Sequence, residues 1–180
     1  GGWLWLTTPD VGWLRTTDPQ TTAMMRHRQE EQSLTGHTGG SRWEWVRLSQ
    51  VSPYLIQAVV QSEDVLFFNH RGFNWESMWQ ALLANLREGK VAVGGSTLTQ
   101  QVAKNIFLSP SRTPIRKLKE AVLSYRLERE LTKTRILELY LNIVEWGPGV
   151  YGAEAAARTY FNKSAAELRL SEAVRLTALL

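Results

Sequence analysis

Gly94-Gly95-Ser96-Thr97-Leu98-Thr99-Gln100-Gln101-Val102-Ala103-Lys104-Asn105 carries the clearest structural pattern in the chain. Two glycines precede a hydroxyl side chain that can cap a helix, so we predict a helix from Ser96 to about Phe107. Helical spacing places three apolar side chains on one face: Leu98, Val102 and Ile106. It places three polar side chains on another: Thr97, Gln101 and Lys104. We expect this helix to bury its apolar face and to present its polar face to a cleft, the alternative being a solvated surface helix.

Helical patterns occur on both sides of this stretch. Ser52-Pro53 and Thr113-Pro114 each place a capping hydroxyl before a proline in the first turn, and Ser164 with Glu167 forms a capping box. We predict further helices at about 52–63, 74–89, 113–131, 133–142, 150–160 and from 164 onward. Short connections and the absence of repeats predict a mostly α fold.

The predicted helix 74–89 has the widest apolar stripe. Its members are Trp75, Met78, Trp79, Leu82, Leu83 and Leu86. A stripe of this width is typical of a helix face turned toward a hydrophobic core, so we expect these side chains to be buried.

Residues 1–50 differ in character from the remainder. Prolines, glycines and polar runs interrupt them, and we expect an extended N-terminal arm before a catalytic domain at 51–180. The apolar run Trp3–Leu6 is far shorter than the roughly 20 residues that cross a bilayer. Tryptophan favours the membrane interface, so Trp3, Trp5 and Trp13 suggest the remnant of a removed anchor or, alternatively, a core patch. The pattern at 170–180 lacks a helix end, and we expect truncation there.

Composition excludes several classes of protein. The 180 residues include 21 Lys and Arg against 17 Asp and Glu, and this net charge of +4 is too small to indicate nucleic-acid binding. There is no cysteine, which rules out disulfides and thiolate zinc sites. The composition is that of a globular domain with a sizeable core.

An acidic pair, Glu63-Asp64, ends the predicted helix 52–63 and precedes an apolar segment. A glutamate beside apolar surface is suited to act as a general base toward a sugar hydroxyl. The alternative is a solvated pair at a helix end. His70 follows and can orient a carboxylate, while Gly72 permits a tight turn.

A basic cluster lies at the start of the predicted helix 113–131. It consists of Arg112, Arg116, Lys117 and Lys119, with Glu120 on the same helix. Guanidinium and ammonium groups bind phosphate oxygens, so the cluster can hold a diphosphate, and Glu120 can order the cations or recruit a divalent metal. The structural alternative is an exposed Arg116–Glu120 salt bridge of about 0.3–0.5 kcal/mol. Four other carboxylates have simple explanations as helix-surface or capping residues: Glu138, Glu145, Glu154 and Glu167.

Together these segments resemble the peptidoglycan glycosyltransferase family, which comprises monofunctional transglycosylases and the N-terminal domains of bifunctional penicillin-binding proteins. The resemblance rests on five blocks in the same order. They are Glu63-Asp64-x-x-Phe67-x-x-His70-x-Gly72, Gly94-x-Ser96-Thr97-x-Thr99-Gln100-Gln101-x-x-Lys104-Asn105, Arg116-Lys117-x-x-Glu120, Lys133-x-x-Ile136-Leu137-x-x-Tyr140-Leu141-Asn142 and Gly149-Val150-Tyr151-Gly152-Ala153. The arm followed directly by these blocks looks like the monofunctional type.

The resemblance implies a lysozyme-like helical fold in two lobes, a globular lobe and a membrane-associated jaw lobe. It implies that Glu63 is the catalytic base and Glu120 a second catalytic carboxylate near the donor diphosphate. Lys104, Arg116 and Lys117 would bind phosphate. The remaining matched residues would bind substrate or fix Glu63: Asp64, Phe67, His70, Gly72, Ser96, Thr97, Gln101 and Asn105.

The implied substrates are lipid II as acceptor and the growing lipid-linked glycan as donor, joined by an inverting β-1,4 transfer that releases polyprenyl diphosphate. The implied cofactor is a divalent cation, Mg or Mn, with no organic cofactor. The implied location is the bacterial inner membrane, with the catalytic domain on its periplasmic or outer face. Cell-wall synthesis or division proteins are candidate partners, and nucleic acid is not expected.

Two rival functions remain at this point. A lytic transglycosylase or lysozyme-like hydrolase shares the helical fold and a single catalytic glutamate, but it must protonate a poor alkoxide leaving group. A diphosphate leaves readily if cations stabilise it, and the basic cluster favours this second chemistry. A non-catalytic membrane scaffold would need the tryptophans and cations but not Glu63.

Overall fold

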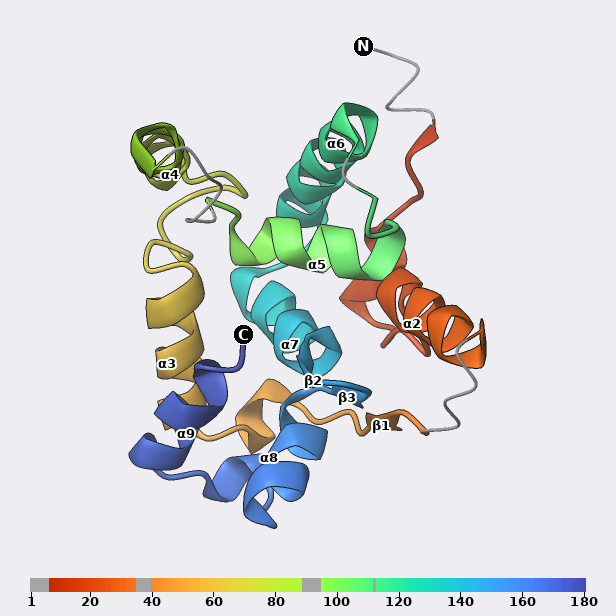
Figure 1. Cartoon of the computed structure of the whole chain (residues 1–180), viewed down its shortest axis with the longest axis vertical. Helices are drawn as coiled ribbons and strands as arrows, with labels where there is room; N and C mark the ends of the chain where they lie inside the picture. The colour runs from red at the N-terminus through yellow and green to blue at the C-terminus, as the bar shows by residue number, and fades with distance from the viewer. Residues whose placement is uncertain (1–6, 35–39, 89–94, 112) are drawn as a thin grey trace.

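The computed structural model describes residues 7–34, 40–88, 95–111 and 113–180, which form a mostly helical fold (Figure 1). The α-helices are α2 (Ala23–Leu34), α3 (Pro53–Glu63), α4 (Trp75–Glu88), α5 (Leu98–Phe107), α6 (Pro114–Glu130), α7 (Lys133–Ile143), α8 (Ala153–Phe161) and α9 (Leu170–Thr177). Short 3₁₀ turns occur at η1 (Gly12–Arg15), η2 (Leu48–Gln50) and η3 (Ala165–Glu167). The mostly α prediction is therefore confirmed.

A small sheet joins the beginning of the chain to its last third. It contains β1 (Arg42–Trp43), β2 (Glu145–Gly147) and β3 (Val150–Tyr151) in the order β1-β3-β2. β1 is parallel to β3, with Arg42 opposite Val150, and β2 is antiparallel to β3. The predicted helix 150–160 therefore begins with a strand, and its helical part starts at Ala153.

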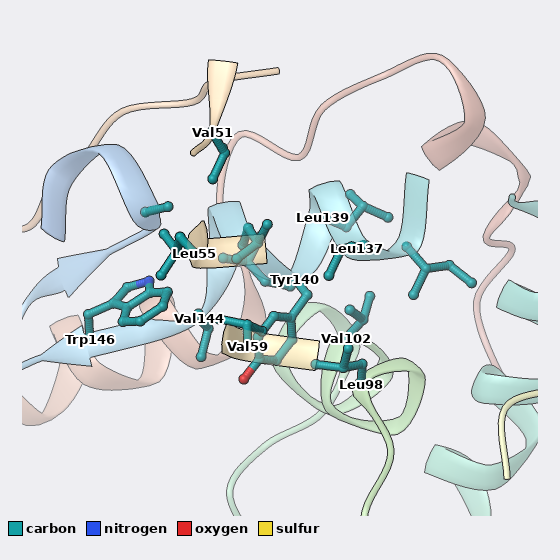
Figure 2. Packing of buried hydrophobic residues seen from close by; sticks show 14 of the residues in the cluster. Val51, Leu55, Val59, Leu98, Val102, Leu137, Leu139, Tyr140, Val144 and Trp146 are labelled. Atoms are coloured by element: carbon teal, nitrogen blue, oxygen red, sulfur yellow. The ribbon is translucent and has the colours of Figure 1, made fainter. Parts of the chain in front are cut away.

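Helix α5 lies at the centre of the fold and packs against α2, α6 and α7 (Figure 1). Its predicted apolar face is confirmed, because Leu98, Val102 and Ile106 are buried. Figure 2 shows Leu98 and Val102 beside side chains of α7, and it shows Val59 of α3 and Trp146 of β2 in the same cluster. This packing fixes the polar face of α5 relative to the end of α3.

The N-cap of α5 is Thr97, not Ser96 as predicted. The Thr97 Oγ1 accepts a hydrogen bond from the Gln100 N–H at 3.2 Å, and the Gln100 Oε1 accepts one from the Thr97 N–H at 3.0 Å. This reciprocal pair satisfies two backbone N–H groups at the helix start. Ser96 is thereby left outside the helix with its hydroxyl free for another partner.

Four residues of the apolar stripe of α4 are exposed and Met78 is half-buried, so the prediction that the stripe forms core was wrong for these residues: Trp75, Trp79, Leu83 and Leu86. The exposed fractions are 71% for Trp75, 61% for Trp79 and 70% for Leu86. The inner face of α4 carries small residues, and a Cβ on Gly95 would lie 3.0 Å from the Met78 Cα. Because the segment at Gly95 approaches α4 so closely, no large side chain fits between them. The Leu82 side chain lies outside the described residues.

Within residues 1–50, the described parts 7–34 and 40–50 contain helical turns that pack against the rest of the chain, which differs from the extended arm that was predicted. Helix α2 packs against α5, and Val11, Leu14 and Met25 are buried in the fold. Trp3 and Trp5 lie outside the described residues, whereas Trp13 lies in η1 and is 39% exposed. Across the described ranges, we find no helix with the length and apolar character needed to cross a bilayer.

Candidate active site

Glu63 is the last residue of α3 and is half-buried. Its Oε2 accepts a 2.7 Å hydrogen bond from the Nε2 of Gln101 on α5. The carboxylate borders a cavity of about 350 Å³, here called the Glu63 cavity, which lies between the end of α3, the inner face of α4 and residues 95–97. The predicted base is therefore oriented by a neutral amide and opens onto space that a ligand can enter.

Asp64 fixes the backbone that carries Glu63. It is buried, and its carboxylate accepts hydrogen bonds from the His70 Nε2 at 2.9 and 3.0 Å and from the Leu98 N–H at 3.0 Å. The Gly72 N–H donates to the His70 Nδ1 at 3.1 Å, which assigns the ring proton of neutral His70 to Nε2. Asp64 thus ties the end of α3 to the start of α5, and this geometry supports a positioning role.

Gly72 and Phe67 support the same connection between the end of α3 and the start of α5. Gly72 has a φ of +86°, which favours glycine, and its carbonyl oxygen accepts a 2.7 Å hydrogen bond from the Thr97 Oγ1. Phe67 is fully buried, and its ring lies 4.4 Å from the Lys133 Nζ. Because Phe67 is a core residue, the structure places it to support the segment that carries Glu63, and its contact with substrate stays a prediction.

A second cavity, here called the cation cavity, has a volume of about 300 Å³ and is bordered by α5 and α6. Glu120 lies in it with a side chain that is only 3% exposed. Its Oε2 accepts a 2.6 Å hydrogen bond from the Arg116 Nη1, and its Oε1 accepts one from the Lys117 Nζ. The Arg116–Glu120 pair is therefore buried, unlike the exposed salt bridge that was the structural alternative.

Three cations face this single carboxylate. Lys104 of α5 borders the cation cavity beside Arg116 and Lys117, which leaves the cavity with net positive charge. Burial lowers the pKa of the Lys104 ammonium from its ordinary value of 10.5; Glu120 opposes that change, and Arg116 and Lys117 add to it. The Nε of Arg116 is buried and has no hydrogen-bond partner among the described residues. A cavity lined by three cations and one carboxylate suits a phosphate group.

The two cavities meet at Ser96 and are linked by Gln101. Ser96 borders both of them and accepts a 3.3 Å hydrogen bond from the Lys117 Nζ. Gln101 borders the cation cavity while its amide binds Glu63. This arrangement places a candidate proton acceptor beside a candidate anion site.

The structure therefore brings together most of the predicted site residues, with different functions for some. Thr97 is buried and caps α5, and it also borders the Glu63 cavity, whereas Asn105 borders a neighbouring cavity with Gln101 and Lys104. Arg112, which belongs to the predicted basic cluster, lies outside the described residues, and Lys119 borders neither the Glu63 cavity nor the cation cavity.

The described residues do not form a ready-made metal site. They contain no group of three or more His, Cys, Asp or Glu side chains placed to hold a metal. Both oxygens of Glu120 accept from cations, so its carboxylate is not free as a ligand. A metal ion would need most of its ligands from a bound phosphate group and water.

Sequence reasoning missed two walls of the site. Asn74, which precedes α4, and Ser77 and Gln80 of α4 border the Glu63 cavity, but Ser77 and Gln80 were hidden beside a much stronger apolar stripe. Helix α2 contributes Met24 to the cation cavity, and Glu145 borders a neighbouring cavity although it was set aside as a helix-surface residue. The other three carboxylates set aside with it make structural contacts: Glu138 with Arg135, Glu154 with the Ala165 N–H and Glu167 with the Ser164 N–H.

Comparison with known proteins identifies related sequences. A family model described as Transglycosylase matches residues 30–180. The biosynthetic peptidoglycan transglycosylase of Azoarcus sp. (strain BH72) is 46% identical over 94% of this chain and 74% of its own length. The proteins of the same name from Methylobacillus flagellatus and Laribacter hongkongensis are each 44% identical, over 93% and 98% of this chain and 73% and 77% of their own lengths.

Proposed function

The chain belongs to the transglycosylase family and is a peptidoglycan glycosyltransferase, and on this basis we propose that it polymerises lipid II into β-1,4-linked glycan strands. The observation that carries the proposal is the position of Glu63, held by Gln101, next to a cavity in which Lys104, Arg116 and Lys117 surround Glu120. The donor is the growing glycan on its polyprenyl diphosphate, and the acceptor is lipid II.

Glu63 acts as the general base. Its carboxylate takes the proton from the acceptor's 4-hydroxyl while that oxygen attacks the anomeric carbon of the donor. The bond between this carbon and the diphosphate oxygen breaks, and the diphosphate departs with the bonding electrons. Because the hydroxyl attacks from the side opposite the leaving group, the configuration at the anomeric carbon inverts.

The cation cavity stabilises the leaving group. Lys104, Arg116 and Lys117 donate hydrogen bonds to phosphate oxygens as negative charge develops on the departing diphosphate. Glu120 accepts from Arg116 and Lys117, so it sets the directions in which these two side chains point. In this proposal Glu120 is a positioning residue, and the cations make the contacts with the substrate.

A divalent cation, Mg or Mn, remains part of the proposal only as an ion that arrives with the diphosphate. The ligand set within the described residues does not fit a resident metal, because the oxygens of Glu120 already accept from two cations. No step of the proposed mechanism passes through a metal. No organic cofactor is required, because the transfer involves only proton movement and exchange of a carbon–oxygen bond.

The exposed apolar face of α4 supports a membrane location. Trp75, Trp79 and Leu86 are exposed on α4, and Phe68 is exposed in the loop that precedes it. Contiguous apolar surface on a soluble domain is a common feature of membrane contact sites, and tryptophan favours the interface. A polyprenyl substrate stays in the bilayer, so the enzyme would bind the outer face of the bacterial inner membrane. Cell-wall synthesis and division proteins stay candidate partners.

The hydrolase alternative is disfavoured by the same cavity. A hydrolase must protonate an alkoxide leaving group, for which a positive cavity beside the base offers nothing. A non-catalytic scaffold would not require an amide aimed at the carboxylate of Glu63.

Incubation of the protein with purified lipid II in detergent or vesicles tests the proposal, with polymer length measured on gels. We expect glycan chains from the wild type and none from a Glu63→Gln variant of equal thermal stability. Shortening of preformed glycan without any lengthening would favour the hydrolase, and vesicle binding without either reaction would favour the scaffold.

A further inference from the structure

Helix α2 forms one wall of a series of cavities that leads away from the diphosphate site. A middle cavity of about 220 Å³ shares Met24, Gln101 and Lys104 with the cation cavity. It also shares Arg28 and Glu145 with a larger cavity of about 500 Å³, here called the α2 cavity. The three cavities therefore follow one another, and the α2 cavity shares no lining residue with the cation cavity.

The α2 cavity has polar groups on both walls. The Arg28 Nη1 of α2 donates a 3.2 Å hydrogen bond to the Glu31 Oε2, and its Nε donates a 3.3 Å hydrogen bond to the Glu145 Oε2 of β2. The Gly149 N–H donates to the Glu145 Oε1 at 3.2 Å, which holds that carboxylate from the other side. Attraction to Glu145 raises the pKa of Arg28, so its guanidinium remains charged.

The chemistry of this cavity differs from that of the diphosphate site. The described residues that line it include one cation and two carboxylates, so their net charge is negative and disfavours a second phosphate group. Carboxylate oxygens and an amide at Gln32 can accept from or donate to hydroxyl and acetamido groups. Leu34 and Pro148 add apolar surface against which a sugar ring can pack. These groups together suit a neutral, polyhydroxylated ligand.

We propose that the α2 cavity is a distal saccharide subsite that holds sugars of the growing donor glycan far from the diphosphate. The inference rests on the proposed function and extends it, because it assigns a substrate contact to a helix outside the predicted catalytic domain 51–180. With the diphosphate in the cation cavity, the nearest sugars lie in the middle cavity, which Arg28 borders, and only a longer glycan reaches Gln32. Binding energy from such remote sugars accelerates the reaction of long donors without affecting short ones.

The test compares two reactions catalysed by the same protein. In the first, lipid II is coupled to lipid II, so the donor carries one disaccharide. In the second, labelled lipid II is added to a preformed lipid-linked octasaccharide. We expect Gln32→Ala, whose side chain borders the α2 cavity and not the middle cavity, to slow the second reaction about three- to tenfold, the effect of one lost hydrogen bond, and to change the first less than twofold. Arg28 borders both cavities, so Arg28→Ala should slow both reactions, and the second more than the first.

Matched controls lie on the same helix. Arg26 and Gln29 are exposed on α2 and border neither the α2 cavity, the middle cavity nor the cation cavity. Arg26→Ala and Gln29→Ala should leave both reactions unchanged. The side chain of Arg28 is 49% exposed, so its loss should not unfold the protein, and Gln32→Ala tests the cavity without breaking the Arg28 ion pairs.

Equal slowing of both reactions, or no slowing of either, would overturn the assignment of the subsite. A wild type that couples no lipid II would instead contradict the proposed function. The two failures are therefore distinguishable, because the second appears before any variant is made.

Discussion

The amide of Gln101 donates a 2.7 Å hydrogen bond to the carboxylate of Glu63, joining the middle of α5 to the end of α3. We expect Gln101→Ala to lower kcat by about 10–100-fold, because a hydrogen bond to a charged group is worth roughly 1.5–3 kcal/mol. Steady-state polymerisation at matched folded concentration measures the effect. Gln57→Ala, on an exposed position of α3, is the control. An unchanged kcat would mean that the amide does not orient the base.

Substitution of Lys117 on α6 should lower turnover with little effect on stability. Lys117→Ala should reduce turnover by about 10²-fold, because it removes a donor to the departing diphosphate. The Lys117 side chain is 47% exposed against 16% for Arg116, so water screens its ion pair with Glu120 more strongly, and the free energy of unfolding should fall by less than about 1 kcal/mol. Lys119→Ala removes a charge of the same sign from the same helix and should change neither quantity. Turnover and chemical denaturation measured on both variants check the prediction.

Arg116 should affect both quantities. Arg116→Ala leaves the buried carboxylate of Glu120 with one partner fewer, which should reduce the free energy of unfolding by about 1–3 kcal/mol as well as slowing turnover. A variant with lower stability but normal turnover per folded molecule would show that Arg116 serves the fold alone.

Local periodicity explains which parts of the fold and site could be predicted. In α5, spacing alone assigned Leu98 and Val102 to the core and Gln101 and Lys104 to the polar face, and the structure has both. Helix starts at Pro53 and Pro114 were predictable because a capping residue and a first-turn proline act within a few residues. The approach of Gln101 to Glu63 depends on the packing of two helices, which no local pattern contains.

Two parts of the structure were not predictable for different physical reasons. An apolar stripe indicates that a helix face avoids water, but it does not show whether the protein core or another apolar surface covers that face. On α4 the stripe of Trp75 and Trp79 faces outward. Helix α2 has few apolar residues, and its place in the site depends on contacts such as Arg28 with Glu145, which is 117 residues away in the chain. The sequence around Arg28 and the sequence around Glu145 contain no pattern that indicates this contact.

The outward stripe of α4 should drive membrane binding. Trp79→Ser and Leu86→Ser together should weaken binding to anionic lipid vesicles at least tenfold, because burial of a large apolar side chain is worth about 1.5–3 kcal/mol. Both residues are exposed, so thermal stability should not change. Leu170→Ser on α9 removes an exposed apolar side chain elsewhere and serves as the control. Vesicle sedimentation that is equal for all variants would exclude α4 from membrane contact.

Lys104 should produce an alkaline limit of activity. Its pKa lies below 10.5 because burial disfavours the ammonium, and only the charged form holds a phosphate group. We therefore expect kcat/KM to fall as the pH rises through that lowered pKa. Lys104→Arg keeps its charge, so the fall should move to higher pH.

The stability of the protein should respond to Lys104 in the opposite direction. Between the lowered pKa of the folded state and 10.5, the unfolded chain binds more protons, so the contribution of Lys104 to the free energy of unfolding rises with pH. Activity and stability that fell together in the wild type, with the same midpoint in Lys104→Arg, would contradict this assignment.

The sharpest test is Glu63→Gln, which should abolish polymerisation while leaving the fold and substrate binding intact. Glutamine retains a carbonyl oxygen that can accept the hydrogen bond of Gln101, so the geometry at the end of α3 is preserved. It cannot take the proton of the acceptor hydroxyl, and general-base catalysis is typically worth about 10²–10⁴-fold. The loss should therefore appear in kcat and not in KM. Glu30→Gln, an exposed change of the same kind on α2, should be silent. Polymer yield near that of the wild type, at matched folded concentration, would exclude Glu63 as the base even though the family assignment would stand.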